Sequence, residues 1–433
     1  MKLKIVLIFI VLLASIYQDC PLVNVFGELA RTPIVFMSIP MGLYLMFSGK
    51  FYISKYNSYL ILYLLYLVII SVFYLAFVII YTGDVNFLGE NLIVKAIKMA
   101  VYPGVIIVYY QFIYTWLDRG EDKFKALMYA LIGLEIFITI FLIIESINLG
   151  SGYFLTAIHA TKAGYWRIRL LTYEESWIGS ILTILIFLPV FLVSYLNQPK
   201  KLKNFVYCLS GFLFLYYTFK SESKGYLLLI LISVFPLVIK RLYENEKTRK
   251  MLVYAVPVIL IGGIGVFLSV SDIILKNWYT SGSFGTRFGS YFASLSIFIH
   301  NPLGVGLGSF IYFLAEAITD LLRSELFSGL ILSEIMGYRS TTEALATKTY
   351  FFDQLILGGL CFLVFFYHFF IKRYVFFSKR KRQDILFVII PLVFAIMGGI
   401  AYFSYDIKYD VWFLFAFTDV LQKKLMTKES DEA

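Results

Sequence analysis

Long apolar runs separated by short charged segments recur along the whole chain, and they constrain its fold more than any other feature. A helix needs about 20 predominantly apolar residues to cross a bilayer, where every backbone polar group must be paired within the protein. A mean hydropathy of +0.81 and a hydrophobic content of 60% exclude an ordinary soluble domain. The sequence therefore predicts an all-α polytopic integral membrane protein. We expect about twelve transmembrane helices, at residues 4–19, 31–49, 58–82, 96–117, 126–148, 177–196, 204–219, 225–240, 251–270, 349–371, 384–402 and 410–422.

The segments between these runs predict a single membrane domain, residues 1–433, with two loops on its outer side. A medium loop covers 149–176, and a long loop covers 271–348 and forms a subdomain. Within the long loop we expect short helices at 287–300 and 311–335. The second has apolar residues at helical spacing, which is typical of a helix that lies on a membrane surface or caps a cavity. The first apolar run lacks a small-x-small cleavage site, so we expect an uncleaved helix there.

The net charge of +10 is explained by topology and needs no nucleic-acid partner. With the N-terminus inside, Lys and Arg gather in the loops of one side, as the positive-inside rule requires. We therefore expect both termini in the cytoplasm. The three Cys and three His show no metal or redox spacing, so no metal and no cofactor is expected. The basic residues left on the outer side are Lys162, Arg167, Arg169, Lys220, Lys224, Lys276, Arg287, Arg323, Arg339, Lys348 and Lys408.

The first candidate site precedes the run at 177–196. Arg167 and Arg169 can hold a phosphate by charge-assisted hydrogen bonds. Glu174 and Glu175 follow closely, and a carboxylate there can orient a sugar hydroxyl or act as a base. The alternative interpretation is an interfacial salt-bridge network beside a helix N-terminus, where acids are favourable.

The second candidate site is the turn Thr218–Gly225, between two short apolar runs. The helix that follows would direct its free backbone N–H groups at the turn, which favours an anion. Ser223 and Lys224 would add a donor and a positive charge. An ordinary capped turn explains the same residues.

The third candidate site joins Arg287 to His300, Pro302 and the glycines at 304, 306 and 308. Arg287 can bind pyrophosphate, and glycines permit a sharp turn or close backbone approach. Pro and closely spaced Gly break helices, and irregular backbone at a membrane is tolerated where it is buried or lines a wet cavity. The alternatives are a loop that needs flexible turns and a structural histidine.

The fourth candidate site lies just before the run at 349–371. Arg339, Lys348 and Asp353 approach the start of that helix. Arg339 and Lys348 are candidate substrate-binding cations. Lys348 could equally extend its side chain to the membrane interface.

These elements, taken in order, resemble the bacterial O-antigen polymerase/ligase superfamily (Wzy-type polymerases) over about residues 165–365. The segment from Arg167 or Arg169 through Glu174 to Ser176 resembles an Arg…Glu-Pro-Ser element, with Glu175 at the proline position. The other three are Ser-x-Ser-Lys-Gly at 221–225 for Thr-x-Ser-Arg-Gly, Arg287 with Asn-Pro-Leu-Gly-Val-Gly-x-Gly at 301–308, and Lys-Thr-Tyr…Gly at 348–358. Lys224 keeps the charge of the family's Arg but loses its bidentate geometry.

The resemblance implies a polymerase of undecaprenyl-pyrophosphate-linked oligosaccharide repeat units, working at the periplasmic face of the inner membrane. Glycan donor and acceptor would both be lipid-linked, and the chemistry would be metal-independent. Other expected partners are membrane lipid and the chain-length regulator and flippase of the same pathway. Glu174 and Arg287 would be catalytic. The residues expected to bind substrate are Arg167, Arg169, Ser223, Lys224, His300, Arg339 and Lys348.

Three alternatives to a polymerase remain: a ligase, a lipid-linked oligosaccharide transporter, and a non-catalytic scaffold or chain-length regulator. Ligases of the superfamily carry a His just before the helix that starts near Lys348, where this chain has Ala346 and Thr347. A lipid-linked oligosaccharide transporter more often has two related halves and charges spread along its spans. A scaffold or chain-length regulator would not need the basic residues at the membrane boundary.

Overall fold

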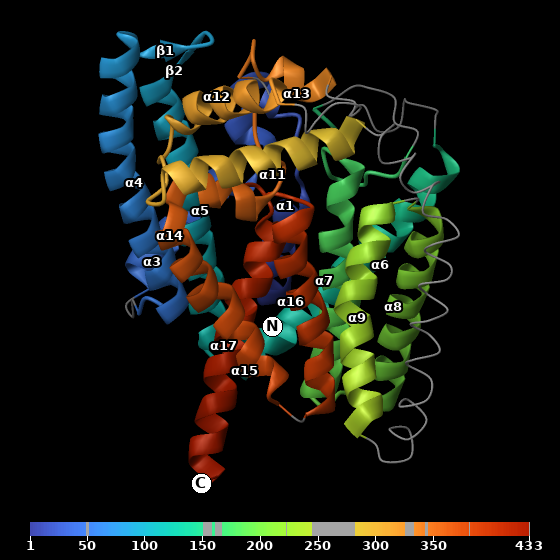
Figure 1. The fold of residues 1–433 in the computed structure, drawn as a ribbon. Coiled ribbons are helices and arrows are strands. Elements are labelled where there is room, and N and C mark those ends of the chain that lie inside the picture. The colour runs from blue at the N-terminus through green and yellow to red at the C-terminus, as the bar shows by residue number, and fades with distance from the viewer. Residues whose placement is uncertain are drawn as a thin grey trace. The chain divides into compact units, whose positions relative to one another are not determined.

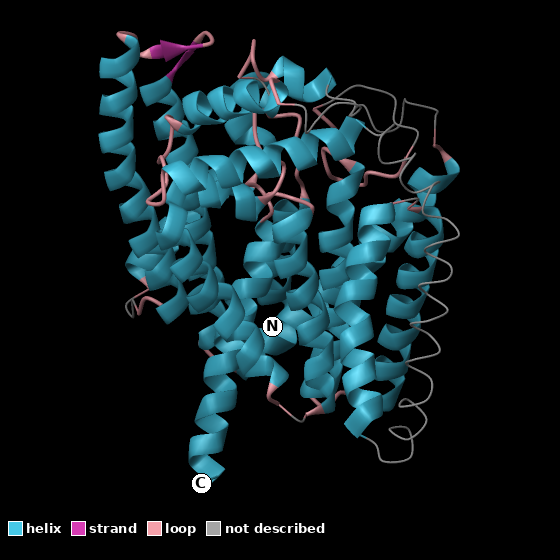
Figure 2. Cartoon of the chain, viewed as in Figure 1, coloured by secondary structure: helices cyan, strands magenta, loops and turns pink. Residues whose placement is uncertain are grey.

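The computed structural model describes residues 1–48, 52–149, 158–160, 167–221, 223–244, 282–324, 333–342, 345–380 and 382–432. Helices dominate these residues (Figure 2). The strands among them are the two-residue β1 (Asn86–Phe87) and β2 (Glu90–Asn91), which pair antiparallel. The expected all-α class is therefore confirmed for the described part of the chain.

Six helical segments in the described residues are long and apolar enough to cross a membrane. They coincide with the third to sixth, tenth and eleventh predicted spans, and they make this a membrane-embedded protein. The helices in them are α4 (Lys55–Thr82), α5 (Leu92–Asp118), α6 (Glu121–Ile147), α7 (Ile178–Tyr195, after the 3₁₀ turn η2, Glu175–Trp177), α14 (Tyr350–Phe366) with the π-turn η4 (Tyr367–Ile371) and α15 (Lys372–Ser378), and α16 (Leu386–Ala401, after η5, Gln383–Ile385).

The other predicted spans do not coincide with a described helix that is both long and apolar enough to cross a membrane. Five of them fall on helices that are shorter or more polar, and residues 251–270 lie outside the described part of the chain. The total of about twelve spans therefore stays a prediction. The five helices are α1 (Lys2–Ile16), α3 (Ile34–Phe47), α8 (Lys200–Lys220), α9 (Lys224–Glu244) and α17 (Tyr409–Glu432), and the short turns α2 (Val23–Phe26) and η1 (Glu28–Arg31) precede α3.

The chain forms two compact units. The first contains Met1–Leu64, Ala100–Leu231 and Phe365–Ala433. Its centre is α7, which packs against α6, α8, α16 and α17 and is buried along almost its whole length. An apolar helix that is buried on all sides loses its amphipathic pattern, which is why 177–196 reads as one uniform apolar run.

The second unit contains Leu65–Met99 and Ile232–Val364. Here α11 (Gly282–His300) packs against α12 (Phe310–Leu322), and both run across the direction of α14 (Figure 1). The helix predicted at 287–300 is confirmed in α11. Both helices belong to the long predicted loop, much of which lies in the described residues.

The predicted helix at 311–335 is wrong in its extent. α12 ends at Leu322, where the Arg323 and Ser324 N–H groups turn back to the carbonyls of Asp320 and Leu321 at 3.2 and 2.9 Å. Such i→i+3 bonds tighten and terminate a helix. A separate short helix, α13 (Ser333–Gly337), follows. The apolar spacing was real, however, because the residues that α12 buries are Phe310, Ile311, Leu314, Ala315 and Ile318.

The α4 helix leaves large apolar side chains uncovered. Val72 is 63% exposed, Phe73 68% and Ile80 82%. A contiguous apolar face of this kind is unfavourable in water and typical of contact with lipid. This supports membrane insertion of α4 independently of its length.

Candidate functional site

The predicted segment at 167–177 folds as a tight turn that leads into α7. The Thr172 hydroxyl donates to the carbonyl oxygens of Arg169 and Glu174, each at 2.7 Å. Arg167 forms an ion pair with Glu175. Glu174 is exposed, and its carboxylate accepts a hydrogen bond from Ser176 at 3.1 Å. The turn therefore brings Arg167 and Glu174 to an accessible edge of the first unit.

Arg169 lies on the inner side of the same turn. Its side chain is 1% exposed and its Nη1 lies 3.4 Å from Asp19 Oδ2. The Glu145 carboxylate, from α6, accepts the backbone N–H groups of Arg169 and Leu170 at 2.8 and 2.9 Å. In this position Arg169 holds the turn in place, and Arg167 is the arginine of the pair that solvent reaches.

Asp19 is the centre of a buried ionic cluster. Its carboxylate meets Arg169, Arg31 at 3.5 Å and the His159 ring at 2.9 Å. Arg31 also pairs with the exposed Glu28. A carboxylate that is fully desolvated is stable only with such partners.

The polar network continues beyond Asp19. Gln18 Nε2 donates to Asp410 Oδ1 at 2.9 Å, and the Ser180 hydroxyl donates to Asp410 Oδ2 at 2.8 Å. Lys408 donates to Ser180 and to the Trp177 carbonyl, both at 3.1 Å. Burial lowers the pKa of Lys408 to about 8, although the charges of Asp410 and Glu174 oppose the shift.

The turn at 221–226 is an ordinary helix-capping turn at the start of α9. The Ser223 hydroxyl accepts the Tyr226 N–H at 3.3 Å, which caps α9, and it lies 3.1 Å from the Tyr402 hydroxyl. A Cβ on Gly225 would lie 2.1 Å from the Tyr402 ring, so a side chain at this position would require that ring to move. Lys224 is exposed at the start of α9, and Glu222 lies outside the described residues. Ser223 thus has a structural role, and Lys224 is the accessible cation.

The Gly-rich loop belongs to a broken helix in the second unit. At Gly359 the backbone of α14 leaves the helical region, with φ +52° and ψ −133°. The polar groups freed by this break are satisfied by the loop that follows α11. Three backbone hydrogen bonds make the connection: Val305 N–H to Ile356 O at 2.9 Å, Gly306 N–H to Leu357 O at 3.0 Å and Leu360 N–H to Pro302 O at 2.8 Å.

The glycines of this loop allow backbone to touch backbone. A Cβ on Gly304 would lie 2.4 Å from the Leu357 carbonyl oxygen, and one on Gly306 would lie 2.6 Å from the backbone of Ser71. Both glycines have positive φ. The predicted close approach is confirmed, and its partners are α14 and α4 of the same unit. Broken helices are tolerated in membranes where the freed backbone is buried or lines a cavity.

Arg287 lies on α11 beside aromatic side chains. The Tyr291 ring stacks on Phe352 with 4.2 Å between centroids. Burial raises the pKa of Tyr291, while the charge of Arg287 and hydrogen bonds with Arg287 and Thr349 oppose the shift. Arg287 is partly exposed. A guanidinium in this setting is held in place and still accessible.

Lys348 has a carboxylate partner. Its Nζ lies 3.0 Å from Glu334 Oε1, and the Thr286 hydroxyl donates to Glu334 Oε2 at 3.0 Å. Burial raises the pKa of Glu334, but Lys348, Thr286 and Tyr338 outweigh it and hold the pKa below its usual value. This pair ties α13 to the start of α14, next to Arg287.

His300 and Arg339 are placed differently from Arg287. His300 ends α11, about 20 Å from Arg287 along the helix axis at 1.5 Å per residue. Its Nδ1 lies 2.8 Å from the Ser296 carbonyl oxygen of its own helix. Arg339 is exposed after α13. The helix therefore does not bring Arg287 and His300 together, and the substrate-binding role of His300 stays a prediction.

Sequence reasoning missed the partners that surround its candidates. Asp19, Arg31, His159 and Asp410 all contribute to the buried network, and Lys408 was recognised only as an outer cation. The available signal was an acid at the end of the first apolar run, since ionisable groups at that depth need partners. Within the described residues, no group of three or more His, Cys, Asp and Glu could hold a metal ion.

The fold and these clusters define a membrane-embedded helical protein with ionic sites outside its apolar helices. No protein-family model matches the chain. It is 29% identical over 157 residues to an uncharacterised 49.5 kDa protein from the cps region of Klebsiella pneumoniae. The match covers 35% of this chain and 36% of that relative, so it spans about a third of either protein.

Proposed function

We propose that this chain is a polysaccharide polymerase that joins undecaprenyl-pyrophosphate-linked oligosaccharide repeat units. The observation that carries the proposal is the similarity to a protein from a capsule (cps) region, which suggests a role in polysaccharide biosynthesis. The order of the short motifs between residues 165 and 365 supports the narrower assignment. The accessible cations beside buried, rigidly held neighbours support a site for a phosphate-bearing substrate.

In the proposed reaction a sugar hydroxyl of an incoming lipid-linked repeat unit attacks the anomeric carbon of the growing glycan. A new glycosidic C–O bond forms, and the bond between the anomeric carbon and the pyrophosphate oxygen breaks. Undecaprenyl pyrophosphate leaves with the bonding electron pair, and a carboxylate accepts the hydroxyl proton. The energy comes from the pyrophosphate linkage, so the reaction needs no nucleotide.

The accessible residues suit these steps. Glu174 is an exposed carboxylate and is the proposed base or acceptor-orienting group. Arg167 and Lys224, in the first unit, are the proposed contacts to the pyrophosphate, whose charge grows as the bond breaks. Arg287, in the second unit, is proposed as a catalytic cation in its own right. Arg169 and Ser223 act as positioning residues, because Arg169 is buried against Asp19 and Ser223 caps α9.

The test is a gel of cell-surface polysaccharide from a strain that lacks the chain, beside its parent. The proposal predicts that long chains disappear while single repeat units persist. Complementation with Glu174→Gln or Arg287→Ala should leave the same defect at normal protein level in the membrane. Long chains of normal length in both variants would contradict the assigned roles.

The same gel distinguishes the alternatives. A ligase would leave long lipid-linked polymer that is not attached to its acceptor, and this outcome would overturn the polymerase proposal. A transporter would leave repeat units on the cytoplasmic side, where outer-face enzymes cannot reach them. An unchanged ladder would exclude every role in assembling that polymer.

A further inference from the structure

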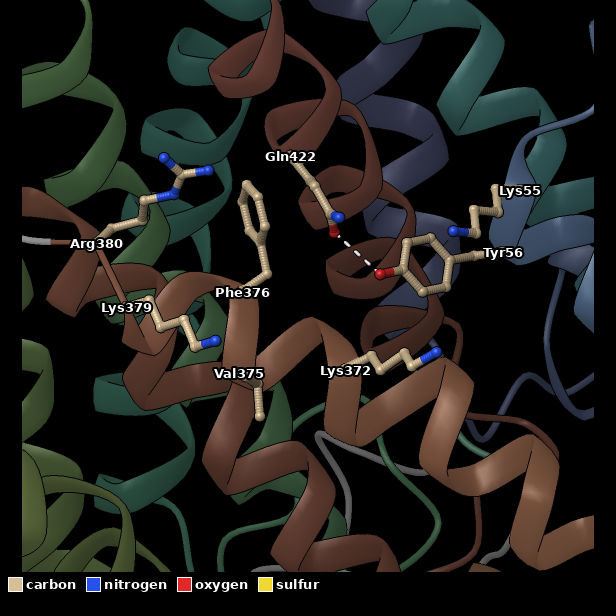
Figure 3. Close-up of a pocket in the computed structure, with 8 residues that line it drawn as sticks. All are labelled: Lys55, Tyr56, Lys372, Val375, Phe376, Lys379, Arg380 and Gln422. Atoms are coloured by element: carbon tan, nitrogen blue, oxygen red, sulfur yellow. Dashed lines mark hydrogen bonds between the residues drawn. The ribbon is translucent and has the colours of Figure 1, made fainter. Parts of the chain in front are cut away.

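A basic pocket lies in the first unit, away from the candidate site. The cavity has a volume of about 480 Å³ and is formed by α15, α17 and the first residues of α4 (Figure 3). Its lining residues are Lys55, Tyr56, Lys372, Val375, Phe376, Lys379, Arg380 and Gln422. Four of the eight are cationic and none is acidic, so the pocket favours an anion.

The polar wall of the pocket is rigid. The Tyr56 hydroxyl donates to Gln422 Oε1 at 3.0 Å, as the dashed line in Figure 3 shows. The guanidinium of Arg373 lies over the Tyr56 ring, 4.1 Å from its centroid. Arg373 is 0% exposed and donates to the Tyr110 hydroxyl at 3.0 Å. The wall is therefore fixed before any ligand binds, which lowers the entropy lost on binding.

The cations around this wall are available to a ligand. Among the described residues, Lys55, Lys372 and Lys379 form no ion pair and are exposed. Three ammonium groups around one cavity repel one another unless an anion lies between them. A phosphate group can accept hydrogen bonds from several of them at once.

The position of the pocket indicates a lipid. Lys55 begins one membrane-length helix and the α15 residues end another. Val375 and Phe376 add an apolar wall beside the cations. The charge distribution of the sequence predicts that this end of the helices faces the cytoplasm. Basic pockets between transmembrane helices on that side bind the head groups of anionic lipids.

We propose that this pocket binds the phosphate-bearing head group of an anionic membrane phospholipid, with the acyl chains directed along the membrane-length helices. The site is separate from the proposed polymerase reaction and does not depend on it. The shared chemistry is a phosphate anion, which a lipid or a soluble phosphate could supply. Val375 and Phe376 favour the lipid, because inorganic phosphate has no apolar part to contact them.

The experiment measures lipid binding to the purified full-length protein in detergent, by native mass spectrometry with phosphatidylglycerol and cardiolipin as titrants. The test variant is the double substitution Lys372→Ala and Lys379→Ala. The matched control is Lys200→Ala with Lys201→Ala, which removes two exposed charges at the start of α8, outside the pocket. At about 1 kcal/mol per cation near an anionic lipid, the test variant should bind roughly 30-fold more weakly.

Three results would overturn the proposal. The first is an equal loss in the control, which would mean that total charge and not the pocket attracts the lipid. The second is an unchanged affinity in the test variant. The third is full competition by inorganic phosphate at the same concentration as the lipid, which would assign the pocket to a soluble anion. Retained lipid binding in the double variant Lys372→Arg with Lys379→Arg would support the proposal. It would also show that weaker binding in the alanine variant comes from the lost charges and not from a folding defect.

Discussion

At the scale of single residues, the buried charges carry most of the information. Asp19 is fully buried and faces Arg31, Arg169 and His159. Without its carboxylate, buried positive charge would lose its counter-charge in a low-dielectric interior. The accessible residues beside them, Arg167 and Glu174, depend on that anchor for their position. Structural and substrate-facing roles are thus divided between neighbouring residues of one turn.

The Asp19 anchor leads to a stability prediction. Asp19→Asn should lower the free energy of unfolding by about 3–5 kcal/mol, because removing one partner leaves uncompensated buried charge. Glu28→Gln is the matched control, since Glu28 also pairs with Arg31 but its side chain is 68% exposed. The control should lose less than about 1 kcal/mol. Thermal unfolding of both proteins in detergent measures the difference, and equal losses would refute the anchor role.

Lys408 leads to a prediction about pH. Below pH 8 its ammonium is charged in both folded and unfolded chains, and the penalty for burying it is fully present. Between pH 8 and 10.5 the folded chain loses this proton while the unfolded chain keeps it, so stability rises with pH. The rise should be about 3 kcal/mol at most.

The variant Lys408→Met should lose this rise, since it has no ammonium to titrate. Lys200→Met, at the exposed start of α8, should keep it. The measurement is the unfolding midpoint of the purified protein at several pH values from 7 to 10.5. A wild-type curve that is flat across this range would contradict the lowered pKa of Lys408.

At the scale of elements, the broken helix α14 is the feature that most shapes the second unit. Its break at Gly359 is paired with the loop from Pro302 to Gly306, so two segments far apart in sequence complete each other's backbone hydrogen bonds. A Cβ on Gly359 would lie 2.1 Å from the Pro302 carbonyl oxygen. Contact between two backbones leaves no flexible side chain to move aside.

Gly359→Ala should therefore destabilise the protein by about 2 kcal/mol or more, through strain at positive φ and the clash with Pro302. Gly211→Ala is the matched control. Gly211 lies inside α8 with open space around it, so alanine there should leave stability unchanged or raise it by up to about 1 kcal/mol. Unfolding midpoints compare the two variants. An unperturbed Gly359→Ala protein would mean that the break in α14 is not needed for folding.

The elements also show how far the sequence could predict this structure. The six long apolar helical segments followed from run length, because bilayer thickness and backbone pairing leave little choice. The glycines at 304 and 306 predicted close approach without naming their partners, which are distant in sequence. The end of α12 at Leu322 was missed, since the apolar spacing continues past it and the terminating turn uses backbone groups alone.

At the scale of the whole molecule, each predicted site residue falls in one of the two compact units. The candidates Arg167, Glu174 and Lys224 belong to the first unit, and Arg287 and Lys348 belong to the second. Local motifs identified the charged residues of the candidate sites. Contacts between segments that are distant in sequence determined which of these residues are buried in structural ion pairs and which stay accessible. Arg169 is the clearest case, because nothing local distinguishes it from Arg167 and only the fold brings Asp19 to it.

The proposed joining of lipid-linked repeat units can be tested in a reconstituted system. The purified chain would be reconstituted in liposomes with undecaprenyl-pyrophosphate-linked repeat units as the only substrate, and the products would be separated by chain length. The proposal predicts longer glycans together with released undecaprenyl pyrophosphate, and neither product with Glu174→Gln. Repeat units that cross the bilayer but stay single would contradict it and identify a transporter instead.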